Sequence, residues 1–392
     1  MSGPLTTRRA VLRAGTAAVA LTGAAWGAGS LYTGTRTGSG GDDGSRPVRI
    51  GYLPITDAAP LLVAHANGYY DDAGVAVARP VLFRSWSSLS EAFVAGKVDA
   101  IHMLMPMALY MRYGLQADVR ITAWNHTNGS SLTVHPEITE LAGLAGRTVA
   151  IPAWWSIHNV VVQKMLRAEG LTPVMRESPS TSAKTVALVP MAPSDMLPAL
   201  SNGVIGGYVV ADPFNAAAEA KHVGTIHRFL GDVWRDHACC VTVLRGQLLR
   251  ERPDQAAGFM DALVRAQAWA RTNRPETAAV LASGYLPQPK PVIQRALTYS
   301  AAEHTGALHH PGWHGESLDF RPYPYPSFTQ ELVRAMQDTV VDAPEGFLAE
   351  LDPAAAHREL VDDALVTRSI AKAGGWGVFG LHGTTRTEEI QA

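Results

Sequence analysis

The chain has 392 residues, 47% of them hydrophobic and 17% charged, and a formal net charge of -2, so it is globular rather than disordered or fibrous. Its 33 basic residues are scattered among 35 acidic ones without a dense Lys/Arg stripe, and this pattern excludes a nucleic-acid binder. The length predicts about two compact units, an arrangement that suits a ligand cleft between two lobes.

Residues 1–46 have the pattern of an export signal followed by a flexible linker. Paired Arg8 and Arg9 precede an uncharged stretch, residues 14–35, that is rich in Ala, Gly and Leu. This pair is similar to the twin-arginine export motif and predicts an extracytoplasmic protein, periplasmic or associated with the cell surface. An uncleaved signal acting as a membrane anchor is the alternative. Gly-rich residues 38–45 predict a tether.

From Val48 onward, short apolar runs alternate with longer amphipathic segments, which predicts an α/β fold with mostly parallel sheets. The expected strands are residues 48–53, 75–83, 100–104, 119–123, 148–151, 185–189, 207–210 and 240–244. Three expected helices each end at a Gly, the residue that best tolerates the positive φ of a helix C-terminus. They are residues 60–67, 86–95 and 157–169, and two further helices are expected from Pro253 and over residues 360–373.

One long excursion of the chain predicts two lobes. Residues 47–146 and 241–350 are expected to form lobe 1, and residues 147–240 lobe 2. The two crossings between the lobes would form a hinge. Residues 351–392 are expected to add a C-terminal helix and a loosely wrapped tail.

Several segments over most of the chain beyond residue 46 follow one another in the order found in one protein family. They are residues 50–61 (IGYLPITDAAPL), 96–107 (GKVDAIHMLMPM), 128–130, 151–158, 212–214 and 233–237. Together they resemble the solute-binding proteins of nitrate, bicarbonate and sulfonate ABC importers, and most closely the nitrate/bicarbonate branch.

This resemblance implies the periplasmic-binding-protein-like type II fold, with two α/β lobes that close around a small anion by hinge motion. It implies a monomer that delivers its solute to an ABC permease and its ATPase, without catalysis and without a cofactor. A solute-binding protein acts in this way because the solute binds the closed form better than the open one.

The resemblance also implies that the anion contacts Ser130, His158 and Arg235, where nitrate-binding relatives carry Gln, His and Lys. Arg235 keeps the positive charge but offers a planar fork, and Ser130 is shorter than Gln, so both departures favour a solute larger than nitrate. The solute therefore stays open among nitrate, bicarbonate, a sulfonate and an uncharged thiamine precursor.

Further ligand-binding residues are predicted where strands end and helices begin, since free backbone N–H groups there favour an anion. They are Thr56, Asp57, Trp86, His102, Met105, Trp155, Ser156 and Asp212. Most have a structural alternative, because Thr and Asp cap helices while Met and Trp fill cores.

No metal site is expected. A calcium-assisted bicarbonate site would need an acidic residue immediately before Arg235, where Trp234 stands, and the histidine spacing suggests no ligand set.

The only two cysteines, Cys239 and Cys240, are adjacent and predict no disulfide framework. They leave an enzyme as an alternative, since relatives of this fold include desulfinases with a nucleophilic Cys and a protein that makes the thiamine pyrimidine. The nearby His237 would lower a thiol pKa, whereas the simpler interpretation is two small thiols on a buried strand. A cytoplasmic nitrate sensor is a third alternative, against which the export signal argues.

Overall fold

The computed structural model describes residues 46–310, 313 and 318–391. The predicted export signal and nearly all of the linker, residues 1–45, lie outside the described residues. None of the described helices is long and apolar enough to cross a membrane.

A five-stranded sheet forms the first lobe, with the strand order β2-β1-β3-β12-β4. Its strands are β1 (Ile50–Tyr52), β2 (Val81–Leu82), β3 (Ala100–Leu104), β4 (Val119–Trp124) and β12 (Cys240–Arg245). β1 is parallel to β2 and β3, whereas β12 is antiparallel to β3 and β4. Every residue of β1 and β3 is buried, as expected for strands covered on both faces.

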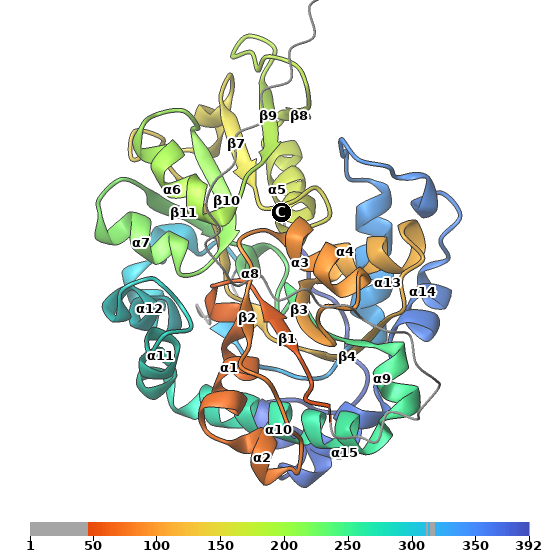
Figure 1. The fold of residues 1–392 in the computed structure, drawn as a ribbon. Helices are drawn as coiled ribbons and strands as arrows, with labels where there is room; N and C mark the ends of the chain where they lie inside the picture. The colour runs from red at the N-terminus through yellow and green to blue at the C-terminus, as the bar shows by residue number, and fades with distance from the viewer. Residues whose placement is uncertain (1–45, 311–312, 314–317, 392) are drawn as a thin grey trace, which may run out of the picture. The chain divides into compact units, whose positions relative to one another are not determined.

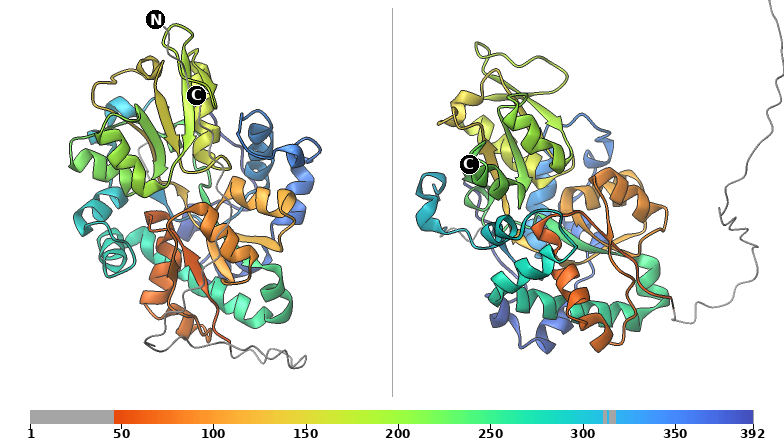
Figure 2. Two further views of the ribbon diagram at one scale, coloured as in Figure 1. Left: turned by 45° about the horizontal axis from the view of Figure 1, so that its top comes forward. Right: turned by 60° about the vertical axis from the view of Figure 1, so that its left-hand side comes forward.

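A six-stranded sheet forms the second lobe, with the strand order β11-β6-β10-β7-β9-β8. Its strands are β6 (Ser130–Val134), β7 (Thr148–Ile151), β8 (Thr172–Val174), β9 (Thr185–Pro190), β10 (Gly207–Ala211) and β11 (Thr225–Phe229). β6 is antiparallel to both of its neighbours, and β7, β8, β9 and β10 run parallel. Figure 1 shows this sheet with α5, α6 and α7 around it, and Figure 2 shows it from two further sides.

A short antiparallel pair, β5 (Thr127–Asn128) with β13 (Leu318–Asp319), completes the strands that the structure describes. The helices of the N-terminal half are α1 (Ala59–Ala66), α2 (Tyr69–Asp72), α3 (Trp86–Val94), α4 (Met105–Leu109), α5 (Ile157–Ala168) and α6 (Pro193–Ser201). Those of the C-terminal half are α7 (Phe214–Ala220), α8 (Leu230–Val233), α9 (Gly246–Glu251), α10 (Pro253–Thr272), α11 (Arg274–Ala282), α12 (Lys290–Leu297), α13 (Pro326–Gln337), α14 (Pro353–Leu360) and α15 (Ala364–Lys372).

Local sequence signals explain where two of the site helices begin and end. Ser85 and Ser156 are the N-caps of α3 and α5, and each Oγ accepts a hydrogen bond from the N–H three residues later. Gly96 and Gly170 follow these helices with φ of 69° and 70°, a conformation that Gly adopts without a Cβ penalty. The predicted helices 86–95 and 157–169 are therefore confirmed to within one residue of their ends.

The structure differs from the predicted elements in three places. The sheets are mixed rather than mostly parallel, because β12 is antiparallel in the first sheet and the unpredicted β6 and β11 are antiparallel in the second. Only residues 81–82 of the expected strand 75–83 form a strand. The helix expected over residues 360–373 begins later, at Ala364, because Leu360 ends α14 and Val361 is extended and pairs with Ile121 of β4.

The lobe boundaries follow from sheet membership. The chain leaves the first sheet after β4, joins the second at β6 and returns to the first at β12. β12 begins at Cys240, beside the expected return to lobe 1, whereas β6 lies in the second sheet and not in the sheet that residues 47–146 were expected to complete. The cause is tertiary pairing, because β6 lies between β10 and β11.

Candidate functional site

A group of buried polar side chains lies where the two sheets meet. Some of them lie in or next to strands of the first sheet, and the others belong to the second lobe. We call this group the central cluster, and each of its members is at most 1% exposed. Its members are Asp57, His102, His126, Ser130, His158, Cys239 and Cys240.

Thr56 and Asp57 lie in the short 3₁₀ turn that follows β1. The backbone N and the Oγ1 of Thr56 both donate to the carbonyl oxygen of Asp212, at 2.8 and 2.9 Å, so Thr56 joins the first lobe to the end of β10. Asp57 Oδ2 lies 2.9 Å from His126 Nε2 and 3.6 Å from Cys240 Sγ. Burial raises the pKa of Asp57 to about 6, although His126 opposes this shift.

His102 and Trp86 place two N–H donors near each other. His102 Nε2 accepts from the backbone N–H of Leu53 at 2.8 Å, so the single proton of a neutral imidazole lies on Nδ1. Burial lowers the pKa of His102 to about 3, which keeps the ring neutral at pH 7. The Trp86 ring centroid is 5.5 Å from that of His102. Neither His102 Nδ1 nor Trp86 Nε1 has a hydrogen-bond partner among the described residues.

His158 brings the second lobe into the central cluster. It lies in the first turn of α5, which the Ser156 cap begins. His158 Nε2 is 2.9 Å from Ser130 Oγ and 3.9 Å from Cys239 Sγ. Within the part of the chain that the structure describes, its Nδ1 contacts no hydrogen-bond partner.

The two thiols contact polar groups rather than an apolar core alone. Their Sγ atoms are 4.0 Å apart, and His126 Nε2 accepts from the backbone N–H of Cys240 at 3.1 Å. Burial by itself raises the pKa of Cys239, but Cys240, His158 and His126 together hold it well below its usual range. His237 makes a different contact from the one expected, since its Nδ1 donates to the carbonyl of Trp234 at 2.8 Å.

Met105 and Trp155 both make core contacts. The backbone N–H of Met105 donates to the carbonyl of Cys239 at 3.1 Å, and its side chain is fully buried. Trp155 stacks on Tyr110, with ring centroids 5.5 Å apart, and meets Phe347 edge-on. Its indole Nε1 has no partner among the residues described.

Asp212 lies at the end of β10 and is 1% exposed. Its Oδ1 accepts from the backbone N–H of Ala216 and from Tyr299 Oη, both at 3.2 Å. Asp212 is not the N-cap of α7, because that position is Pro213, but its bond to Ala216 still satisfies an N–H of the first helical turn. Burial raises the pKa of Asp212 to about 8.

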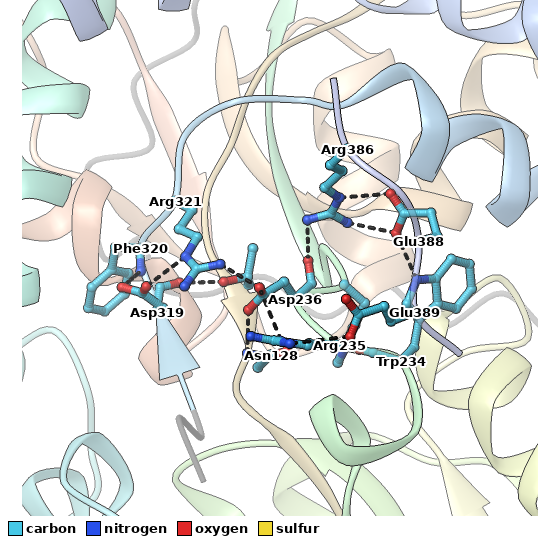
Figure 3. Close-up of polar contacts among 12 residues, drawn as sticks. Asn128, Trp234, Arg235, Asp236, Asp319, Phe320, Arg321, Arg386, Glu388 and Glu389 are labelled. Atoms are coloured by element: carbon cyan, nitrogen blue, oxygen red, sulfur yellow. Dashed lines mark hydrogen bonds and ion pairs between the residues drawn. The ribbon is translucent and has the colours of Figure 1, made fainter. Parts of the chain in front are cut away.

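Arg235 does not join the central cluster. Its side chain is 41% exposed, and Nη1 lies 3.2 Å from Glu389 Oε2. The C-terminal tail causes this placement, since the N–H of Arg235 donates to the carbonyl of Glu389 and Trp234 pairs with Ile390. Figure 3 shows Arg235 beside Glu389, with the neighbouring Arg386–Glu388 pair on the same tail.

His126, Cys239 and Cys240 are cluster members that the sequence did not single out as site residues. The available signal was positional, since His126 follows β4 and the cysteines open β12 at the same edge of one sheet. Ligands of α/β proteins bind outside strand ends, so residues at these positions are candidates for a binding site.

Sequence comparisons relate the chain to one protein family and to several curated proteins. The NMT1-like family matches residues 41–284. The nitrate/nitrite binding protein NrtA of Nostoc sp. (strain PCC 7120) is 24% identical over 242 residues, 56% of this chain and 53% of that protein. The nitrate import ATP-binding protein NrtC of Synechocystis sp. (strain PCC 6803) is 25% identical over 231 residues, 55% of this chain and 34% of that protein. The chain spans about half or less of the length of these relatives.

Structural comparisons confirm the predicted fold class. The periplasmic nitrate-binding protein NrtA from Synechocystis PCC 6803 superposes with a TM-score of 0.70 at 20% identity, covering 83% of this chain and 88% of that one. The periplasmic sulfonate-binding protein SsuA from Methylobacillus flagellatus KT has a TM-score of 0.60 at 16% identity, covering 87% and 98%. The fold is therefore that of periplasmic binding proteins.

Proposed function

Since the chain belongs to the NMT1-like family, we propose that it is the solute-binding protein of an ABC importer and captures a small oxyanion outside the cytoplasmic membrane. Nitrate and nitrite are the first candidates, because the nitrate/nitrite binding protein NrtA is among the relatives, and a larger sulfonate is the alternative that the short Ser130 side chain favours. The relative NrtC, an import ATP-binding protein, supports a permease and its ATPase as partners. This role requires binding and release and no catalytic step.

The observation that carries this proposal is a set of three buried N–H donors without partners among the described residues. They are Trp86 Nε1, His102 Nδ1 and, when the Ser130 hydroxyl donates to His158 Nε2, His158 Nδ1. A buried donor without an acceptor costs about 1–3 kcal/mol. An oxyanion offers acceptors in several directions and no donor, which is the chemistry that such donors need.

The donors come from both lobes, which suits capture by closure. Trp86 and His102 belong to the first lobe, on α3 and β3, whereas His158 belongs to α5 of the second. A solute that bridges them would stabilise the closed arrangement over an open one. Thr56 and Ser156 would act indirectly, Thr56 through its two bonds to Asp212 and Ser156 by capping α5.

The crossings before β6 and before β12 would supply the hinge for this closure. Residues 1–46 would export the folded chain by the twin-arginine route, as their Arg8-Arg9 pair indicates. Export would bring the binding site outside the cytoplasm, where an importer collects its solute.

Thermal unfolding of the purified protein with single anions tests this function. A ligand at 100 times its dissociation constant should stabilise the fold by about 2.7 kcal/mol. We expect this from nitrate or nitrite, with bicarbonate and methanesulfonate as comparison anions. A protein that none of the four stabilises would refute anion capture.

Two variants test the site itself. His158→Ala should abolish the shift, because it removes a donor and leaves the Ser130 hydroxyl without that partner. Arg235→Gln is the matched control and should keep the full shift, since Arg235 pairs with Glu389 outside the cluster. If Arg235→Gln abolished the shift and His158→Ala kept it, the solute would bind at Arg235 and the three-donor site would be rejected.

A further inference from the structure

Four side chains of the central cluster present ligand atoms to one small space. Asp57, His126, Cys239 and Cys240 are all buried, and one ligand atom from each lies within 4.8 Å of all the others. We propose that these four residues bind one Zn²⁺ ion. The inference does not rest on the proposed function, because no anion or transport step enters it.

Three of the six distances between the ligand atoms lie near the edges of a tetrahedron around Zn²⁺. Zn–S bonds of about 2.3 Å and Zn–N or Zn–O bonds of about 2.0–2.1 Å give tetrahedral edges of about 3.8 Å for S–S, 3.6 Å for S–O and 3.3 Å for N–O. The Sγ atoms of Cys239 and Cys240 are 4.0 Å apart, and Cys240 Sγ is 3.6 Å from Asp57 Oδ2. His126 Nε2 is 2.9 Å from the same oxygen. Small side-chain shifts would therefore complete the geometry.

Hydrogen bonds within the group do not satisfy its polar atoms. His126 Nε2 faces both the N–H of Cys240 at 3.1 Å and Asp57 Oδ2 at 2.9 Å, but one ring nitrogen has either a lone pair or a proton. Asp57 Oδ1 has no partner among the described residues, and the carboxyl is fully buried. A cation bound between the thiols, the imidazole and the carboxylate would take the lone pair of His126 Nε2 and neutralise the buried charge of Asp57, and so would replace the competition at Nε2 by one metal bond.

The donor set selects the class of metal. Ca²⁺ and Mg²⁺ prefer oxygen ligands, whereas two sulfurs, one imidazole and one carboxylate suit Zn²⁺ in a closed four-ligand site. Such a site stabilises folded structure rather than exposing a reactive metal. Binding would release the thiol protons of Cys239 and Cys240 to solvent, because the thiolate is the ligand.

The fold explains what such an ion would hold together. Asp57 follows β1, His126 lies between β4 and β5, and the two cysteines lie where the chain returns to the first sheet at β12. These segments are far apart in the chain and meet only at this edge. The ion would link the chain segment that returns to the first sheet at β12 to the loops that follow β1 and β4.

Cobalt substitution gives a direct test, because the chain has two cysteines and both are in the proposed site. The full chain, either equilibrated with Co²⁺ when folded or refolded with it, should bind one ion. It should also show the intense near-ultraviolet absorption of Co²⁺–thiolate bonds, which Zn²⁺ abolishes by displacement. Zn²⁺ should also raise the unfolding temperature and slow the reaction of both thiols with a thiol reagent.

Cys240→Ser should weaken Zn²⁺ binding at least tenfold, whereas His382→Ala, an exposed histidine, should leave it unchanged. If the cysteine variant does not fold, the cobalt spectrum of the unmodified chain decides. Absence of thiolate bands after both loading routes, with no Zn²⁺ effect on unfolding, would overturn the proposal.

Discussion

Replacing Asp212 by Asn should stabilise this protein progressively as the pH rises from about 4 to 8. The Asp212 carboxyl is 1% exposed, and burial raises its pKa from 3.8 to about 8. Between these values the folded chain binds a proton that the unfolded chain does not bind. Its contribution to stability is therefore fully present below about pH 4 and is lost as the pH rises through about 8.

The size of the effect follows from the same shift. One pKa unit corresponds to about 1.4 kcal/mol, so a rise from 3.8 to about 8 corresponds to about 6 kcal/mol over the whole window. Asn does not titrate, and its Oδ1 can still accept from Ala216 and Tyr299 as the Asp212 Oδ1 does. The variant should therefore match the unmodified protein near pH 4 and exceed it by more than about 2 kcal/mol at pH 8.

Urea unfolding, followed by tryptophan fluorescence at several pH values, measures this difference directly. The subtraction of the two curves isolates Asp212 from other groups that titrate, such as Asp57. Parallel stability curves for the two proteins across pH 4 to 8 would refute the reasoning, because they would mean that Asp212 is ionised in the folded chain without cost.

Asp232 provides a matched control with the opposite expectation. It is also fully buried, but Arg228 Nε lies 2.8 Å from its Oδ2 and the N–H groups of His309 and His310 donate to its Oδ1. Asp232→Asn removes the negative charge beside Arg228, so it should destabilise the protein by about 2–3 kcal/mol at pH 7. A stabilising effect here would show that these two buried carboxyls do not differ as their contacts indicate.

Two further substitutions test single contacts by urea unfolding. Thr56→Val removes the hydroxyl bond to the Asp212 carbonyl but keeps the backbone bond, and should cost about 1 kcal/mol; no loss would mean that this contact does not join the lobes. Gly258→Ala lies within α10, where helix propensity favours Ala by about 1 kcal/mol. Its Cβ would lie 2.8 Å from the Ala73 carbonyl oxygen and 2.5 Å from Val75 Cγ2, so we expect net destabilisation of about 1 kcal/mol, and a stabilised variant would contradict it.

Features that depend on neighbours along the chain could be predicted from the sequence. The Ser85 and Ser156 caps each bond to an N–H three residues away, and Gly96 and Gly170 end the same helices. The buried strands were recognisable for a related reason, since a strand covered on both faces is apolar at every position. The order of the motifs then led to the fold class that the structural comparisons confirm.

Pairing between distant segments could not be predicted in this way. β6 has only two apolar residues, Leu132 and Val134, and nothing within its sequence indicates that its partners are β10 and β11. Arg235 stands in a site motif, yet the tail residue Glu389 holds it at the surface. The spacing of apolar residues in a segment indicates which of them are buried, but not which residues they pack against.

The central cluster shows the same division. Local sequence signals predict that His158 lies in the first turn of a capped helix and that Cys239 and Cys240 lie at the start of a buried strand. The contact of Asp57 and His126 with these thiols depends on the tertiary fold, because the four residues come from three segments that meet at one end of the first sheet. The energy of such a cluster depends on distances between side chains, and those distances exist only once the sheet has formed.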